Sequence, residues 1–300
     1  NCTFGSEFLI TGFNKLDGLK IPLFILFLTL YLAACIENIL IIMLVTTSTH
    51  LQTPMYFILC SLSCCELMYI TTMVPKMLYD ILSERATISF IGCLTQLQLY
   101  GTIGNTMSYH YSLMSYDRYI AISNPLQYSS VINNRFCLCF IIGFWIISFA
   151  SLINVPAFIS HLTFCDPNII DHFHCDLFPL IELSYSDTTL LLIIIAAQSS
   201  FITMLPLLFV FSTYTFIMYT ILKIPSTTGR KKAFSTCSSH LIVIAINYGL
   251  IVSVYVLPKR VTSLAVTKGL SFLYFLVIPL LTPMIYTLRN KDIHKALTRK

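Results

Sequence analysis

The stretch Met114-Ser115-Tyr116-Asp117-Arg118-Tyr119 closes the third long apolar segment of the chain. An acid next to a base is uncommon at the end of a membrane helix, because each charge is costly in or near hydrocarbon unless it is paired or hydrated. Such a pair can hold together in one state and separate in another. The stretch therefore predicts a switch at the inner end of a membrane helix.

The composition excludes an ordinary soluble protein. Hydrophobic residues make up 56% of the chain and charged residues 10%, whereas soluble domains have roughly 45–50% and about 25%. Every apolar block is expected to be helical, because backbone polar groups must satisfy one another in lipid. Seven blocks come near the roughly 20 residues that cross the hydrocarbon, at 21–46, 55–79, 91–117, 137–160, 189–222, 234–257 and 265–288.

The predicted fold class is an all-α membrane protein, a single domain over residues 1–300 built as a seven-transmembrane helix bundle. Residues 1–20 form the N-terminal segment, 21–288 the bundle and 289–300 the tail. The third block is the least apolar, and we expect it at the centre of the bundle because its polar side chains must face the interior. These side chains are Gln96, Gln98, Asn105, Ser108 and His110.

The basic residues set the orientation. Eleven of the 18 Lys and Arg lie in segments that face the cytoplasm if the N-terminus is outside, while the 161–187 loop has none and carries five acids. This positive-inside pattern predicts an extracellular N-terminus and explains the net charge, so we expect no nucleic-acid partner. Asn1-Cys2-Thr3 is a glycosylation sequon with Asn1 as acceptor. The tail, with Ile293 and Leu297 four residues apart, is either a short cytoplasmic amphipathic helix or a frayed end.

Four motifs occur in a fixed order along the chain. They are PMYFIL at 54–59, MSYDRY with AISNPLQY at 114–128, KAFSTCSSH at 232–240 and PLLTPMIYTLRN at 279–290. Together with the long outer loop, they closely resemble the motifs of vertebrate odorant receptors, which are rhodopsin-like G-protein-coupled receptors. The resemblance covers nearly the whole chain. The chain departs from the family at Glu37, where Gly is usual, at His174 in the loop, and at Thr282, where Asn is usual.

The resemblance implies an odorant receptor. It would bind a small, mostly apolar volatile in the outer half of the bundle and activate a stimulatory, olfactory-type heterotrimeric G protein, raising cAMP. It implies a multi-pass protein in the plasma membrane of olfactory sensory neuron cilia, surrounded by lipid and without a cofactor. A non-olfactory rhodopsin-like receptor for another small lipid-like or metabolite ligand is the alternative. A transporter is less favoured, because only Glu37 and Glu66 lie at membrane depth, and no enzyme motif or catalytic residue is found.

Three cysteines, Cys93, Cys165 and Cys175, lie in outer segments, where disulfides persist. The resemblance implies a bridge between Cys93 and Cys175 that ties the outer loop to the third helix. It also places the usual partner of Cys165 at position 185, which is Tyr185 here. We therefore predict that Cys165 lacks its usual partner, with Cys2 as the only other outer candidate.

The inner ends of the helices carry the predicted activation switch. Arg118 can pair with Asp117 at rest, which satisfies both charges near the inner lipid face. The resemblance implies that on activation Arg118 turns inward to meet Tyr214 and His240, while Tyr286 repacks beside them. Taken alone, His240 would be a satisfied inner-face histidine, but its place in the 232–240 motif favours the switch. The predicted set is Asp117, Arg118, Tyr119, Tyr214, His240 and Tyr286.

We predict a ligand cavity formed by the outer halves of helices three, five, six and seven beneath the 161–187 loop. Its wall is expected to be apolar and aromatic with a few hydrogen-bonding groups. The expected lining is Tyr100, Gly101, Gly104, Asn105, Ser108, Gln198, Ile202, Tyr248, Ile251, Val252, Tyr255, Phe272 and Phe275. Amine receptors of this class have an aspartate at the place of Tyr100, and we find no acid in the outer half of any helix. A neutral ligand is therefore expected, although Lys259 could favour a carboxylate unless it is an interfacial lysine.

Two groups of residues have the chemistry of an ion site. Glu66 in the second helix is the deepest charge, and in the wider receptor class the acid at this place helps to hold a sodium ion or a water cluster. Thr282 in place of Asn weakens that ligand set, so Glu66 is a weak sodium-site candidate, and a protonated, hydrogen-bonded glutamate is an equal alternative. The segment His172-Phe173-His174-Cys175-Asp176 has the residue types of a metal site, but Cys175 is expected in the disulfide. We predict no metal site there.

Overall fold

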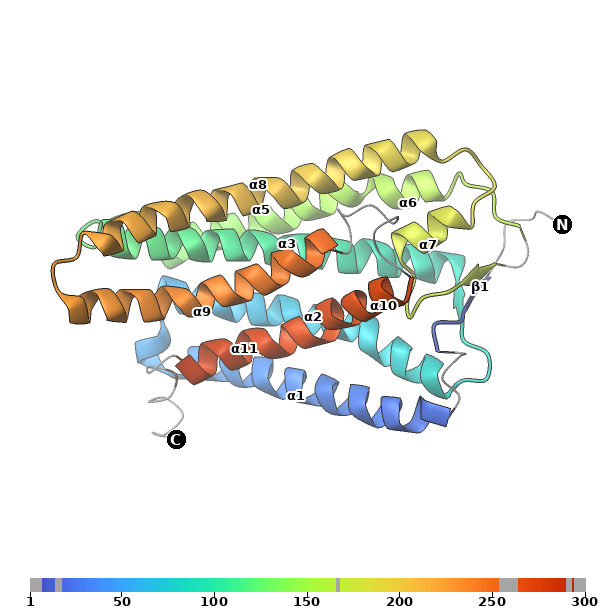
Figure 1. Cartoon of the computed structure of the whole chain (residues 1–300), viewed down its shortest axis with the longest axis horizontal. Helices are drawn as coiled ribbons and strands as arrows, with labels where there is room; N and C mark the ends of the chain where they lie inside the picture. Colours follow the sequence, from blue (N-terminus) through green and yellow to red (C-terminus); the bar gives the residue numbers. More distant parts are fainter. Residues whose placement is uncertain (1–6, 14–17, 166–167, 254–263, 290–292, 294–300) are drawn as a thin grey trace.

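A computed structural model describes residues 7–13, 18–165, 168–253, 264–289 and 293. Within these residues, helices occupy all seven predicted blocks (Figure 1). The long helices are α1 (Lys20–Thr47), α2 (Pro54–Leu82), α3 (Phe90–Ser123), α5 (Asn134–Leu152) with α6 (Asn154–Ile159), α8 (Thr189–Leu222), α9 (Thr227–Ile251), and α10 (Leu264–Phe272), which continues through the π-helical turn η4 (Leu273–Val277) into α11 (Ile278–Arg289).

Local sequence signals explain where several helices begin. Pro54 opens α2, where its missing N–H is not needed. Ser89, Asn133 and Ser226 precede α3, α5 and α9, and each side-chain oxygen accepts a hydrogen bond from a backbone N–H of the first turn. Because Ser226 caps α9, that helix begins at Thr227, before the apolar block at 234–257 from which it was predicted.

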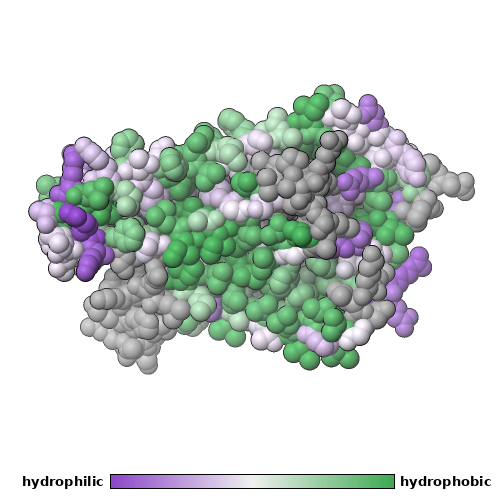
Figure 2. All heavy atoms as spheres, viewed as in Figure 1, coloured by the Kyte–Doolittle hydropathy of each residue, from purple (hydrophilic) through white to green (hydrophobic). Residues whose placement is uncertain are grey.

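The outer surface of the bundle is apolar. Side chains such as Ile21 (67% exposed) and Phe211 (71% exposed) project from α1 and α8. Figure 2 shows hydrophobic residues across the middle of one face and hydrophilic residues gathered toward the two ends. An apolar surface of this extent marks contact with a membrane. Among the described helices, α1, α2, α5 with α6, α8 and the segment Lys268–Tyr286 are long and apolar enough to cross one.

The helix α3 is long but too polar to meet the same criterion, and it packs against α2, α5 and α8. Its polar side chains find partners on these neighbours. The ring of His110 hydrogen-bonds Ser61 of α2 at 2.9 Å, and Ser115 hydrogen-bonds Thr213 of α8 at 2.7 Å. Central packing therefore satisfies the polar groups that would be costly against lipid.

A small sheet at one end of the bundle was not predicted, so the described fold is not purely helical. The strand β1 (Glu7–Ile10) pairs antiparallel with β2 (Thr87–Ser89) and parallel with β3 (Ile169–Ile170). Phe8 and Ile10 of β1 are buried. The sheet and the short helix α7 (Leu177–Glu182) lie at one end, whereas the turn between α8 and α9 lies at the other (Figure 1). The short elements η2 (Thr49–Leu51) and α4 (Tyr128–Val131) complete the described structure.

The predicted tail helix falls mostly outside the described residues. The helix α11 ends at Arg289, and beyond it only Ile293 is described, with a side chain that is 1% exposed. The sequon at Asn1 also lies outside the described residues, as do Tyr255 and Lys259.

Candidate ligand cavity and inner switch

A cavity of about 120 Å³ lies beneath α7. At about 30 Å³ per molecule in the liquid, this is space for roughly four water molecules, and it is close to the volume of about 150 Å³ that holds a small organic molecule such as benzene. Most of the wall comes from α3, from α5 with α6, and from α8. The lining residues are Tyr69, Leu97, Gln98, Tyr100, Gly101, Gly104, Asn105, Ser108, Leu152, Val155, Pro156, Leu177, Ile195, Gln198, Ser199, Ile202, Thr203, Ile251 and Tyr274.

The structure places eight of the predicted lining residues in this wall, namely Tyr100, Gly101, Gly104, Asn105, Ser108, Gln198, Ile202 and Ile251. Four described residues of the predicted set, Tyr248, Val252, Phe272 and Phe275, are not in the wall. Tyr248 is buried behind it and donates a hydrogen bond to the Ser108 carbonyl at 3.3 Å. As ligand contacts, these four residues remain a prediction.

The seventh helix explains two of these differences. Its π-helical turn at Leu273–Val277 accommodates an extra residue, which changes the side chains that face the cavity. Tyr274 faces the cavity, while Phe272 packs against Phe27 of α1 with tilted rings, at 4.8 Å between ring centroids. Phe275 instead contacts His174 of the outer loop, at 4.4 Å between ring centroids. No local sequence signal marks the π-helical turn.

The fourth helix supplies a part of the wall that the sequence did not indicate. Leu152 of α5 and Val155 and Pro156 of α6 line the cavity. All three belong to a continuous apolar block, in which hydropathy does not separate a cavity-facing residue from a lipid-facing one. The side chain of Asn154 in α6 was a usable signal, because its Nδ2 donates to Gln198 Oε1 at 3.2 Å and so joins helices four and five.

Some polar side chains in the wall already make hydrogen bonds to other residues, and others do not. Gln198 is paired with Asn154, and Ser108 donates to the Gly104 carbonyl at 3.2 Å. The Asn105 amide makes no hydrogen bond to another described residue and is half-buried at the cavity. Gln98 Oε1, also in the wall, is buried without a partner among the described residues. Asn105 and Gln98 are therefore the amides in the described wall that have groups free to bond a ligand.

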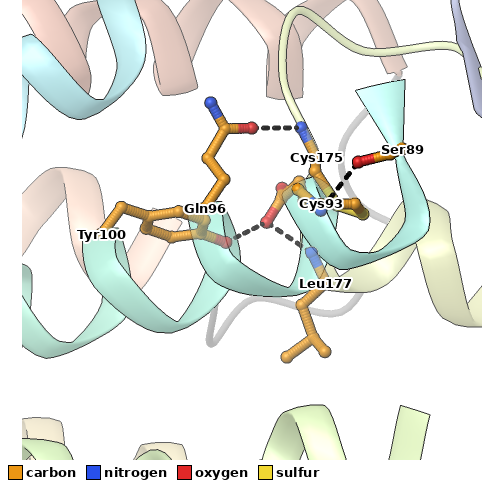
Figure 3. The surroundings of a disulfide bond; sticks show 8 residues. Ser89, Cys93, Gln96, Tyr100, Cys175 and Leu177 are labelled. Atoms are coloured by element: carbon orange, nitrogen blue, oxygen red, sulfur yellow. Dashed lines mark hydrogen bonds between the residues drawn. A yellow bond between two sulfur atoms is a disulfide. The ribbon is translucent and has the colours of Figure 1, made fainter. Parts of the chain in front are cut away.

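The outer loop is fixed to α3 at the cavity mouth. Cys175 forms a disulfide with Cys93, which confirms the bridge that the resemblance implied. Figure 3 shows the surrounding hydrogen bonds, in which Gln96 Oε1 accepts from the Cys175 backbone N–H and the Tyr100 hydroxyl donates to Asp176 Oδ1 at 2.9 Å. The side chain of Tyr100 thus links the cavity wall to the loop.

Cys165 is disulfide-bonded, although Tyr185 stands at the position of its usual partner. One sequence-based statement about the outer end needs correction. The statement that the outer helix halves hold no acid is wrong, because α2 extends to Leu82 and includes buried Asp80, which pairs with Lys76. Asp80 is not in the cavity wall.

The predicted switch residues meet at the opposite end of the bundle. The carboxylate of Asp117 is 1% exposed. Its Oδ2 lies 3.3 Å from Arg118 Nη2, and its Oδ1 accepts a hydrogen bond from the Tyr128 hydroxyl at 2.6 Å. Tyr214 and His240 are hydrogen-bonded to each other. The ring of Tyr286 lies 6.2 Å from that of His240.

One predicted member of the switch lies apart from the others. Tyr119 packs its ring against Phe216 of α8, at 6.1 Å between centroids. The sequence reasoning also missed Tyr128, which belongs to the short helix α4 and bonds Asp117. The Arg118–Asp117 pair and the Tyr214–His240 hydrogen bond coexist in this structure.

Glu66 lies deep between helices, with its side chain 1% exposed. Asn38 and Thr282 are its neighbours, and Asn38 Nδ2 donates to the Ala34 and Pro279 carbonyls, both at 3.0 Å. Glu66 Oε1 and Asn38 Oδ1 are buried without a partner among the described residues. These oxygens fit either a protonated carboxyl group or a cation, so the sodium site stays a prediction.

Comparison with known proteins agrees with the sequence motifs. A family profile described as "Olfactory receptor" matches residues 27–300. Olfactory receptor 10A7 of Homo sapiens is 40% identical over 100% of this chain and 95% of the relative. Olfactory receptor 5I1 of Homo sapiens is 40% identical over 99% and 94%, and olfactory receptor 8U3 of Mus musculus is 39% identical over 99% and 93%. The chain therefore belongs to the olfactory receptor family, a family of receptors and not of enzymes.

Proposed function

We propose that this chain is an odorant receptor that binds a small, neutral, mostly apolar volatile in the cavity beneath α7. Binding there activates a stimulatory, olfactory-type G protein and raises cAMP. The chain acts as one receptor domain with seven membrane crossings, in the plasma membrane of sensory cilia. The observation that carries the proposal is the cavity itself, which is lined mainly by apolar and aromatic side chains and is joined to the outer loop through Tyr100.

The size of the cavity limits the affinity. A ligand of about ten heavy atoms at ~0.5 kcal/mol per atom gains about 5 kcal/mol, which corresponds to a Kd in the high-micromolar range. No charged side chain belongs to the described wall. We therefore expect contact area and one or two hydrogen bonds to supply the binding energy.

Seven crossings require α3 and α9 to span the membrane beside the five more apolar segments. The packing of α3 among α2, α5 and α8 supports this, because a helix surrounded by other helices need not be apolar on every side. The positive-inside pattern favours an extracellular N-terminus, which puts the cavity outside and Asp117 with Arg118 inside. A shift of helices around the cavity would then reach the inner pair through α3, which carries residues of both sites.

A glycine substitution tests the cavity directly. A Cβ added at Gly104 would lie 3.4 Å from Tyr274 Oη and 3.7 Å from a carbon of Tyr69, so a methyl group fits and a larger side chain must enter the cavity. Gly104→Leu should abolish cAMP responses to odorants that activate the wild type. The matched control is Gly143→Leu in α5, where an added Cβ meets nothing within 4 Å.

The readout is cAMP in cells expressing each variant, across a library of volatiles, at equal surface expression. The proposal predicts lost responses for Gly104→Leu and wild-type responses for Gly143→Leu. Full responses of Gly104→Leu to every wild-type agonist would show that odorants bind elsewhere.

A further inference from the structure

The loop segment between β3 and α7 holds a cluster of buried side chains that the odorant cavity does not use. His172, His174 and Asp176 occur at every second residue and are 1%, 5% and 2% exposed. One ligand atom from each side chain lies within 4.8 Å of the other two. The two imidazole rings meet edge to face, 4.5 Å apart at an angle of 88°.

The imidazoles in this cluster have unused bonding capacity. Both ring nitrogens of His172 and Nε2 of His174 are buried and find no hydrogen-bond partner among the described residues. A buried polar group without a partner costs about 1–3 kcal/mol. Packing alone therefore leaves three nitrogen atoms that a bound group could satisfy.

The chemistry of the three side chains suits a metal ion. A neutral imidazole offers a nitrogen lone pair, and His is the commonest metal ligand in proteins. One nitrogen of each imidazole and one Asp176 oxygen lie within 4.8 Å of one another.

The carboxylate of Asp176 is held in place. Its Oδ1 accepts hydrogen bonds from the Tyr100 hydroxyl at 2.9 Å and from the Leu177 backbone N–H at 2.8 Å (Figure 3). Such supporting hydrogen bonds orient metal ligands and are part of a built site. The positive charge of Lys268 is paired with Asp171, which leaves Asp176 available to offset the charge of a cation.

We propose that His172, His174 and Asp176 bind one Zn²⁺ or Cu²⁺ ion at the outer mouth of the receptor. Two imidazoles and a carboxylate are typical ligands of these cations, whereas Ca²⁺ and Mg²⁺ prefer oxygen. The sequence argument against a metal was that Cys175 is committed to a disulfide. This ligand set does not need Cys175.

The geometry requires a modest closure of the side chains. Metal–ligand distances of about 2.0–2.1 Å in a tetrahedral site bring neighbouring ligand atoms to roughly 3.4 Å from each other. The widest separation of 4.8 Å must therefore shrink by about 1.4 Å, which side-chain rotations can supply. Three protein ligands leave a fourth position for water or for an external ligand.

Metal titration of the purified full-length receptor tests the site. Zn²⁺ and, separately, Cu²⁺ are titrated in competition with a chromophoric chelator, using wild type, His172→Phe, His174→Phe and the control His161→Ala. His161 is an exposed imidazole of the same outer loop, outside the cluster. We expect one ion per chain, affinity at least tenfold lower in each phenylalanine variant, and affinity within twofold of wild type in the control.

An unchanged affinity in His174→Phe, an equal loss in His161→Ala, or no saturable binding by wild type would overturn the proposal. X-ray absorption of the zinc-loaded wild type gives a test that needs no variant to fold. We expect a shell of nitrogen and oxygen with the scattering pattern of two imidazoles. A sulfur ligand at about 2.3 Å would place a cysteine in the site and contradict the assignment.

Discussion

At the scale of single residues, Asn105 and Arg118 carry most of the functional argument. Asn105 is a half-buried polar group in an apolar wall, and its amide bonds no other described residue. Arg118 is paired with a carboxylate that is almost fully buried. Both residues lie on α3, one beside the proposed ligand cavity and one near the opposite end of the helix.

Asn105→Val should weaken the response to odorants that carry a hydroxyl or carbonyl group. Losing a neutral hydrogen bond costs about 0.5–1.5 kcal/mol, which corresponds to a roughly 2- to 13-fold rise in EC50. Responses to a hydrocarbon of the same shape should change little. The measurement is a cAMP dose–response for matched pairs of odorants, and an equal shift for both members of a pair would assign Asn105 to packing instead.

Arg118→Ala should leave the receptor at the cell surface and abolish agonist-driven cAMP, because the inner pair would be lost. Arg135→Ala is the matched control, since Arg135 is an exposed arginine at the inner end of α5. Surface staining and cAMP are measured on the same cells. Undiminished signalling by Arg118→Ala at equal surface expression would remove Arg118 from the coupling mechanism.

At the scale of elements, the lengths of the apolar blocks predicted where the long helices lie. They did not predict the small sheet or the π-helical turn. Seven blocks of the sequence correspond to described helices. Five of the described segments are long and apolar enough to cross a membrane. The small sheet escaped prediction, since the strands at 7–10, 87–89 and 169–170 are very short and far apart in the chain. The π-helical turn escaped for a different reason, because no residue type in 273–277 requires it.

The prediction at the scale of elements concerns the disulfides of the outer loop. Cys93→Ser or Cys175→Ser should abolish surface delivery or response, because a bridge across 82 residues is worth about 4–5 kcal/mol on the chain-entropy model. Cys165→Ser should also reduce surface delivery, since Cys165 is disulfide-bonded. Cys139→Ser, at an exposed free thiol of α5, is the control.

Flow cytometry of intact cells and peptide mapping under non-reducing conditions check this prediction. Surface levels of Cys165→Ser equal to those of Cys139→Ser would show that the second bridge is dispensable. The peptide map would identify the cysteine that Cys165 binds.

At the scale of the whole molecule, the apolar belt (Figure 2), the candidate cavity and the Asp117–Arg118 pair lie at three levels along the bundle. The helix α3 spans two of them, with cavity residues such as Gly104 near the outer loop and Asp117 at the inner end. Sequence reasoning placed residues of both candidate sites on α3, from the motif at 114–119 for the inner pair and from position along the helix for the cavity. Sequence reasoning could not identify which residues of helices four and seven line the cavity. In both helices, some apolar side chains face the cavity and others face away from it.

The central claim is that a small neutral odorant in the outer cavity activates the receptor. It is tested by cAMP dose–response curves for an alcohol and for the acid and amine of the same carbon skeleton, on wild type and Lys259→Ala. The described wall contains no charged side chain, so the alcohol should be at least tenfold more potent than either ion on both proteins. Activation by the acid alone, and only when Lys259 is present, would contradict the account.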